Sequence, residues 1–235
     1  MKTFHAAVFF GVIAMTGLMK LSGSSSEAVD RSKSVADRVK EYGSAARSRL
    51  KPAFHKAEVS YPPKRVVFVG IKAEKRLEVY AAGADGSARL VHTYPILAAS
   101  GGPGPKLREG DRQVPEGIYP IESLNPNSRF HLSLRVGYPN ASDRAQASAE
   151  GRTKLGGDIM IHGNAVSIGC LAMGDPAAEE LFVLAADTGV KNITVILTPV
   201  DFRKGVEVPS DTKLPPWTKT LYDNVRKELA KLPAK

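Results

Sequence analysis

Short apolar runs separated by glycine and proline are the feature that most limits how residues 65–200 can fold. The runs are rich in Val, Ile, Tyr and Phe, and each is five to eight residues long. Runs of this length and composition, bounded by turn residues, predict β-strands. We expect strands at 66–71, 77–81, 90–97, 117–121, 130–136, 158–162 and 193–198. The fold class is therefore mainly β.

One helix is predicted inside this β-rich region and one on either side of it. Asp175 suits the N-cap of the inner helix, Pro176 suits its first turn, and the helix ends near residue 187, before Gly189. Residues 27–50 carry a thin apolar stripe, and the linker at 51–63 ends in two prolines. We therefore expect a β domain with helical additions.

The C-terminal segment repeats large apolar residues at four-residue steps, at Trp217, Leu221, Val225 and Leu229. This stripe predicts a helix that docks on the domain, with binding to a membrane surface as the alternative. By contrast, residues 138–157 are polar or small. We expect a long loop there, either functional or disordered.

The first residues have the composition of an export signal. Lys2 gives a positive start, residues 6–19 are an apolar run, and residues 22–26 are small. The run is shorter than the ~20 residues of a membrane span, so we expect a cleaved signal, with an uncleaved anchor as the alternative. The expected organisation is a signal or anchor at 1–24, a helical arm and linker at 25–63, a main domain at 64–202 and a helical extension at 203–235.

The charge balance narrows the classes of partner. The formal net charge is +9, and a basic surface favours anionic polymers in general, including nucleic acid, anionic lipid and acidic wall material. The sequence has no block of five or more Lys and Arg and no nucleic-acid motif. A nucleic-acid partner is therefore not expected.

Cys170 is the only cysteine of the chain, so it is either an inert buried thiol or a reactive one. His162 lies eight residues earlier, at the end of a predicted strand, and an imidazole can take the proton of a thiol nucleophile. Gly169 allows close approach of the backbone, and its amide and that of Cys170 are candidate donors to an oxyanion. Ser167 is the candidate that orients the other imidazole nitrogen. The alternative is a core histidine beside an ordinary buried cysteine.

A metal site is the weaker interpretation of the same residues. His92, His131, His162 and Cys170 are potential zinc ligands, but they lack paired-ligand spacing. The loop at 101–110 lacks the Gly-Lys-Ser/Thr ending of a phosphate loop. We expect no metal and no other cofactor.

Several motifs together resemble the YkuD-like L,D-transpeptidase catalytic domain family, and in particular its YafK-like branch. The segments HGN at 162–164 and SIGCLAM at 167–173 resemble the family signature. Seven further segments of the chain resemble the pattern of the YafK-like branch: SGG at 100–102, GPKL at 104–107, EGDRQ at 109–113, PEGIY at 115–119, NPNSRFHLS at 125–133, YPNA at 138–141 and DRA at 143–145. The resemblance covers about residues 60–200, in the family's order.

The resemblance implies a β-sandwich catalytic domain at 64–202 that acts in the periplasm on peptidoglycan stem peptides. It implies that Cys170 attacks the carbonyl at the L-centre of meso-diaminopimelate and forms a thioester, while His162 accepts the thiol proton. An amine acceptor then gives transpeptidation, and water gives hydrolysis. The YafK-like branch is associated with releasing an outer-membrane lipoprotein that is linked to peptidoglycan.

The chain departs from the family pattern at two positions beside the cysteine. Ala172 stands where many members have arginine, and Ile168 stands where a basic residue is common. Both departures suit the YafK-like branch, and they leave the binding of a substrate carboxylate without its usual cation. Arg144 and Arg152 are the candidates to replace it. The remaining residues expected to bind substrate are His131, Gly163 and Asn164.

The expected function is hydrolysis of an L,D-type bond in peptidoglycan by a cysteine enzyme. The first alternative is a transpeptidase that makes cross-links or attaches a lipoprotein. The second is an inactive module that binds peptidoglycan, although the His162/Cys170 pair argues against it. A general cysteine peptidase acting on proteins is the poorest fit.

Overall fold

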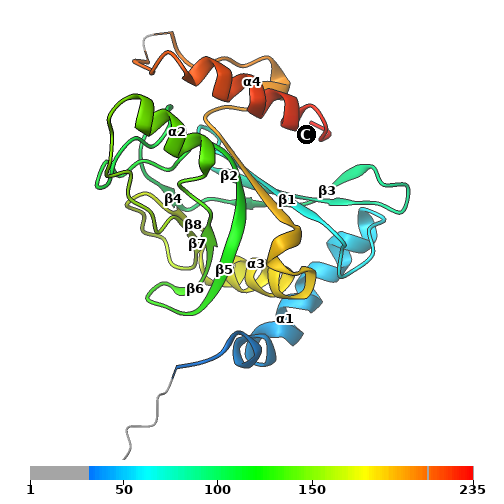
Figure 1. Cartoon of the computed structure of the whole chain (residues 1–235). Helices are drawn as coiled ribbons and strands as arrows, with labels where there is room; N and C mark the ends of the chain where they lie inside the picture. Colours follow the sequence, from blue (N-terminus) through cyan, green and yellow to red (C-terminus); the bar gives the residue numbers. More distant parts are fainter. Residues whose placement is uncertain (1–31, 211, 235) are drawn as a thin grey trace, which may run out of the picture. The chain divides into compact units, whose positions relative to one another are not determined.

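The fold is built on one β-sheet with helices packed around it (Figure 1). The computed structural model describes residues 32–210 and 212–234, which belong to one compact unit. The expected signal or anchor at 1–24 lies outside the described residues. Within them, no helix is long and apolar enough to cross a bilayer.

Nine strands of the described chain form the sheet, in the order β3-β2-β1-β9-β5-β6-β7-β8-β4. Their bounds are Val66–Ile71 (β1), Arg76–Ala82 (β2), Ala88–Pro95 (β3), Ala98–Ala99 (β4), Gly117–Ser128 (β5), His131–Val136 (β6), Met160–His162 (β7), Leu171–Ala172 (β8) and Ile193–Thr198 (β9). The pairs β1/β9 and β7/β8 are parallel, and the others are antiparallel.

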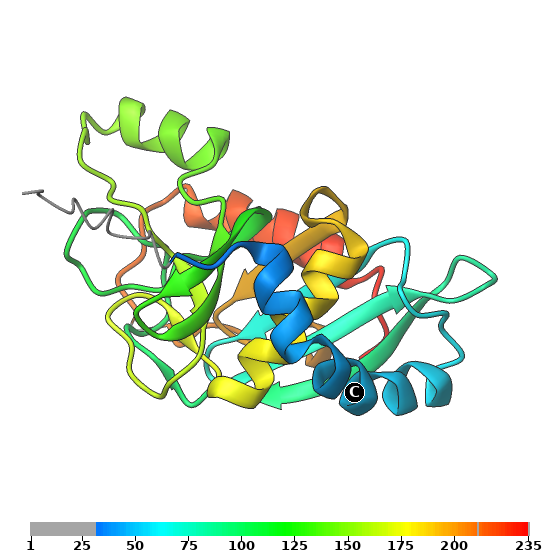
Figure 2. The ribbon, with the colours of Figure 1, turned by 90° about the horizontal axis from the view of Figure 1, so that it is seen from below.

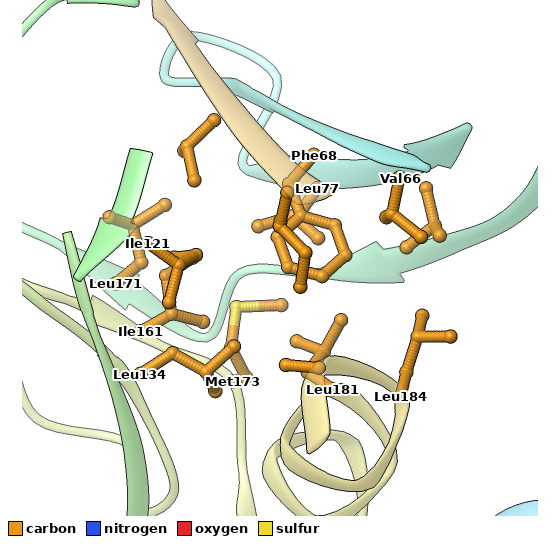
Figure 3. Close-up of a cluster of buried hydrophobic side chains, with 14 of the residues drawn as sticks. Val66, Phe68, Leu77, Ile121, Leu134, Ile161, Leu171, Met173, Leu181 and Leu184 are labelled. Atoms are coloured by element: carbon orange, nitrogen blue, oxygen red, sulfur yellow. The ribbon is translucent and has the colours of Figure 1, made fainter. Parts of the chain in front are cut away.

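The long strand β5 joins the two halves of the sheet. Its first residues pair with β9, and from Ile121 onward it pairs with β6. Side chains from both halves and from helix α3 (Asp175–Thr188) meet in one core, where Phe68, Leu134 and Leu181 are fully buried (Figure 3). This architecture confirms the expected mainly-β class with helical additions.

Helix α1 (Val35–Lys56) packs lengthwise on α3 (Figure 2). Leu50 and Phe54 of α1 are buried in the hydrophobic core. Arg47 makes two hydrogen bonds, of 2.8 and 2.7 Å, to the carboxylate of Asp187 on α3. A bidentate pair of this kind fixes orientation as well as contact, so α1 is part of the folded unit.

Two expectations about helices are wrong. The segment expected to be a loop contains helix α2 (Ala141–Ala149), which begins at Asn140 with a capping box closed by Asp143. Its helical residues are nearly all polar or small and only Ala147 is buried, so it has no apolar stripe to detect. Asp175 is the first residue of α3 rather than its N-cap, which is Gly174.

Helix α4 (Thr218–Leu229) covers the outer face of β1 and β9, which confirms docking of the C-terminal segment. Tyr222, Val225 and Leu229 are buried there, against residues that include Val69 and Ile196. The short helices Val190–Asn192 (η1) and Phe202–Lys204 (η2) flank β9. The apolar stripe of α4 is thus used inside the fold.

A buried ion pair ties α4 to the loop before β5. Glu116 is fully buried, and its Oε1 accepts hydrogen bonds from Lys72 Nζ at 2.8 Å and from the Gly104 amide at 2.9 Å. Its Oε2 accepts a hydrogen bond of 2.6 Å from the Tyr222 hydroxyl. Burial lowers the pKa of Lys72 and raises that of Tyr222. A buried carboxylate needs all of these donors, because each one lost leaves charge unpaired.

We expect Tyr222→Phe to reduce the free energy of unfolding by about 1–3 kcal/mol, because Oε2 of Glu116 then lacks its donor in a dry site. Urea denaturation measures the change. Lys219→Ala is the matched control on the same helix, because Lys219 is 83% exposed in its pair with Asp223. Its cost should stay within about 0.5 kcal/mol. Equal effects of the two substitutions would contradict the structural role of the buried pair.

Candidate active site

A cavity of ≈ 630 Å³ opens beside β7, and both Cys170 and His162 line it. The other lining residues come from β5, β6 and the turn between them, from the loop after α2 with the start of β7, from the segment just before Cys170, and from the loop that contains Lys106. The strands β6, β7 and β8 lie side by side under it. The structure thus brings the two residues singled out by their chemistry to one wall.

The pairing of β7 with β8 brings the segments of His162 and Cys170 together. The two strands are parallel, with His162 opposite Ala172. His162 is the last residue of β7, and Cys170 directly precedes β8. The imidazole and the thiol thus reach the same cavity from two adjacent strands.

The Cys170 thiol is partly buried and protonated. Burial raises the pKa of Cys170, and the charge of Asp158 adds to this, while the Met160 amide and Lys106 act in the opposite direction. Its Sγ donates a 3.6 Å hydrogen bond to the carbonyl of Asp158. Cys170 is therefore a neutral thiol directly before β8.

His162 is held as a neutral base. The ring is 1% exposed, and burial lowers the pKa of His162. Its Nδ1 donates to the carbonyl of Gly163 at 2.5 Å, which leaves Nε2 as the proton acceptor. Phe130 stacks on the imidazole with ring centroids 4.8 Å apart. The group that orients the ring is thus the Gly163 carbonyl and not Ser167.

Ser167 instead holds the loop that presents the cysteine. Its Oγ donates to the Cys170 carbonyl at 2.7 Å and accepts from the amides of Gly169 at 3.3 Å and Cys170 at 3.2 Å. It also accepts from the amide of Ser100 at 3.2 Å. In this conformation the two amides expected to face an oxyanion are directed at Ser167. Gly169 has φ +132°, a conformation that a side chain would strain.

The segment after His162 is fixed by α3. The amide of Asn164 donates a 2.7 Å hydrogen bond to Asp175 Oδ1, and Asn164 has φ +61°. Gly163 is buried, with the backbone of Phe130 close behind it. Asp175 therefore secures the segment that follows His162.

None of the five residues expected to bind substrate is among the residues that line the cavity. Gly163 and Asn164 belong to the segment directly after His162, and the other three make contacts elsewhere. His131 turns to Glu179 on α3, at 3.1 Å, and packs edge-on against Tyr42 of α1. Arg144 contacts the carbonyl of Pro139. Arg152 pairs with Glu150 and donates to the carbonyl of Leu107, and it lines a separate cavity of ≈ 490 Å³.

The cations that do line the cavity are Lys106 and Arg129. Lys106 is 7% exposed and is held by Asp111 at 2.6 Å and by the carbonyl of Arg108 at 2.8 Å. Arg129 is exposed at the rim. Sequence reasoning missed both, together with Phe130 and Ser133, because their contribution depends on how the loops fold over β7. Within the described residues, no group of three or more His, Cys, Asp and Glu side chains could hold a metal ion.

Comparison with known proteins agrees with the motifs. Residues 64–200 match the family model described as the L,D-transpeptidase catalytic domain, YkuD. Two proteins named "Putative L,D-transpeptidase YafK", from Escherichia coli K12 and from E. coli O157:H7, are 41% identical over 113 residues. The match covers 47% of this chain and 43% of each relative, so the chain spans less than half the length of these relatives.

Solved structures give weaker matches. The helical cell shape determining protein Pgp2 of Campylobacter jejuni is 25% identical, with a TM-score of 0.46 over 65% of this chain and 54% of that one. Bd1075 of Bdellovibrio bacteriovorus is 19% identical, with a TM-score of 0.43 over 73% of this chain and 56% of that one.

Alkylation of Cys170 by iodoacetamide should show a pH midpoint above that of an ordinary cysteine, because burial disfavours the thiolate. Asp158→Asn should move the midpoint to lower pH, because it removes a negative charge that raises the pKa of Cys170. Glu109→Gln is the matched control, since Glu109 also lines the cavity and is not among the causes of that shift. A midpoint that Asp158→Asn leaves in place would refute the electrostatic account.

Ser167→Ala should loosen the cysteine loop without unfolding the protein. The amides of Gly169 and Cys170 lose their acceptor, so we expect their hydrogen exchange to accelerate about tenfold. Hydrogen–deuterium exchange mass spectrometry of the peptide covering 163–173 measures this change. Ser142→Ala, on the exposed surface of α2, should leave the same peptide unaffected. Identical exchange in wild type and Ser167→Ala would show that the hydroxyl does not hold the loop.

Proposed function

Because this chain belongs to the L,D-transpeptidase catalytic domain (YkuD) family, we propose that it is a periplasmic cysteine enzyme that modifies peptidoglycan, with Cys170 as nucleophile and His162 as base. The observation that carries the proposal is a single cavity that is lined by both a neutral thiol and a neutral imidazole. A buried pair of this kind transfers its proton during attack rather than beforehand.

The first half of the reaction forms a thioester. Nε2 of His162 takes the proton of the Cys170 thiol as sulfur attacks the carbonyl at the L-centre of meso-diaminopimelate. The carbon–nitrogen bond then breaks, and the imidazolium gives its proton to the leaving amine. The carbonyl of Gly163 stabilises the imidazolium throughout, because it accepts from Nδ1.

The charges around the cavity suit a substrate that carries both an ammonium and a carboxylate group. Lys106 and Arg129 are positive, and Glu109 and Asp158 are negative. Stem peptides with meso-diaminopimelate present both signs near the reacting carbonyl. We assign the carboxylate to Lys106 and Arg129, in place of the arginine that Ala172 replaces.

In the second half, an acceptor attacks the thioester and frees Cys170. Water gives hydrolysis, with release of a peptidoglycan-linked lipoprotein as the proposed biological outcome. An amine gives transpeptidation, the alternative outcome. In both cases His162 takes a proton from the acceptor and returns it to the thiolate.

Mass spectrometry of muropeptides after incubation with purified sacculi tests the assignment. Wild type should change the profile, and Cys170→Ala should leave it unchanged. His162→Gln keeps the volume beside Phe130 but removes the base, so its rate should fall about 10²- to 10⁴-fold.

His92→Gln is the matched control, because His92 is exposed on β3 and lies outside the cavity lining. It should retain the wild-type rate. If Cys170→Ala changes the sacculi as wild type does, the protein is not a Cys170-dependent enzyme. A wild-type protein that binds sacculi without altering them would be an inactive binding module.

A further inference from the structure

Ser133 is a buried hydroxyl on the cavity wall without a protein partner. It lies on β6 between two fully buried leucines, and it is 1% exposed. Its Oγ has no hydrogen-bond partner among the residues that the structure describes, yet the residue lines the cavity of Cys170. Buried hydroxyls are nearly always paired, so an unpaired one at a reactive cavity calls for a functional explanation.

The strand register places this hydroxyl directly beside the base. Ser133 is opposite His162 in the antiparallel pair of β6 and β7. The Gly163 amide donates a 3.2 Å hydrogen bond to the Leu132 carbonyl. The adjacent pair, Leu132 with Gly163, is therefore a hydrogen-bonded pair. Ser133 and His162 therefore form a non-hydrogen-bonded pair, in which side chains approach most closely, with Cβ atoms about 4.5–5.5 Å apart.

The strand order places Ser133 and Cys170 on opposite sides of His162. Ser133 is its neighbour on β6, and Cys170 directly precedes β8 on the other side of β7. All three residues line the same cavity. A small molecule bound beside the imidazole can therefore meet the Ser133 hydroxyl on the side away from the thiol.

We propose that the Ser133 hydroxyl holds the nucleophile of the second half-reaction, a water molecule or an acceptor amine, against Nε2 of His162. This inference rests on the proposed function. The Ser133 Oγ hydrogen-bonds the acceptor while Nε2 removes its proton, and the acceptor attacks the thioester carbon. The carbon–sulfur bond breaks, the electron pair returns to sulfur, and the imidazolium protonates the thiolate.

The test separates acylation from deacylation. Wild type and Ser133→Ala are mixed with a purified disaccharide-tetrapeptide muropeptide, and intact-protein mass spectrometry follows the acylated fraction of Cys170 with time. We expect Ser133→Ala to acylate at nearly the wild-type rate and to lose the acyl group about tenfold to a hundredfold more slowly. The acyl-enzyme should therefore accumulate in the variant only.

The structure offers a matched control in Thr188, a second buried hydroxyl whose Oγ1 is unpaired among the described residues and which lies on α3, outside the cavity lining. Thr188→Val should leave both half-reactions unchanged. Ser133→Ala removes a polar group that has no protein partner, so its melting temperature should equal or exceed that of wild type.

The outcomes distinguish the two proposals. If wild type neither acylates Cys170 nor consumes the muropeptide, the proposed function fails. If wild type turns over and Ser133→Ala deacylates at the same rate, the role of Ser133 fails while the proposed function stands. A variant that remains folded but slows acylation and deacylation equally also overturns the role, because Ser133 then supports the site generally.

Discussion

The hydrogen bond from Nδ1 of His162 to the carbonyl of Gly163 is the interaction on which the candidate site depends. It fixes one tautomer in a ring that burial keeps neutral, so Nε2 faces the reaction as an acceptor. The donor and acceptor belong to consecutive residues at the end of β7. A base oriented by its own backbone needs no third side chain, which leaves Ser167 free to hold the cysteine loop.

The raised pKa of Cys170 and the lowered pKa of His162 have the same physical cause and support each other. A thiolate–imidazolium pair would place two charges where burial penalises both. The neutral pair avoids that penalty, and in the proposed reaction charge develops only when a substrate carbonyl is present to accept it. Phe130, stacked on the imidazole, maintains the dry surroundings that make the resting state neutral. Phe130 also lines the cavity with Ser133, where the second half-reaction is proposed to take place.

The features that could be predicted from the sequence are those set by residues close together in the chain. Strands such as β1 and β9 were predictable, because apolar composition and local turn residues determine them. The pair of His162 and Cys170 was identifiable because both lie in one short segment. The positions of Lys106, Arg129 and Ser133 depend on long-range pairing, which local spacing does not encode. Helix α2 was missed because its polar capping box stabilises it without an apolar stripe.

The C-terminal extension also helps to position the site, although the family model ends at residue 200. Tyr222 on helix α4 donates a hydrogen bond to Glu116, and Glu116 also accepts one from the amide of Gly104. The loop that follows Gly104 carries Lys106 into the cavity wall and brings the Gln113 carbonyl behind Gly169. A buried carboxylate tolerates little displacement, because every lost donor leaves charge unpaired. The extension therefore sets the position of the loop behind the cysteine, and the catalytic unit includes residues beyond the matched domain.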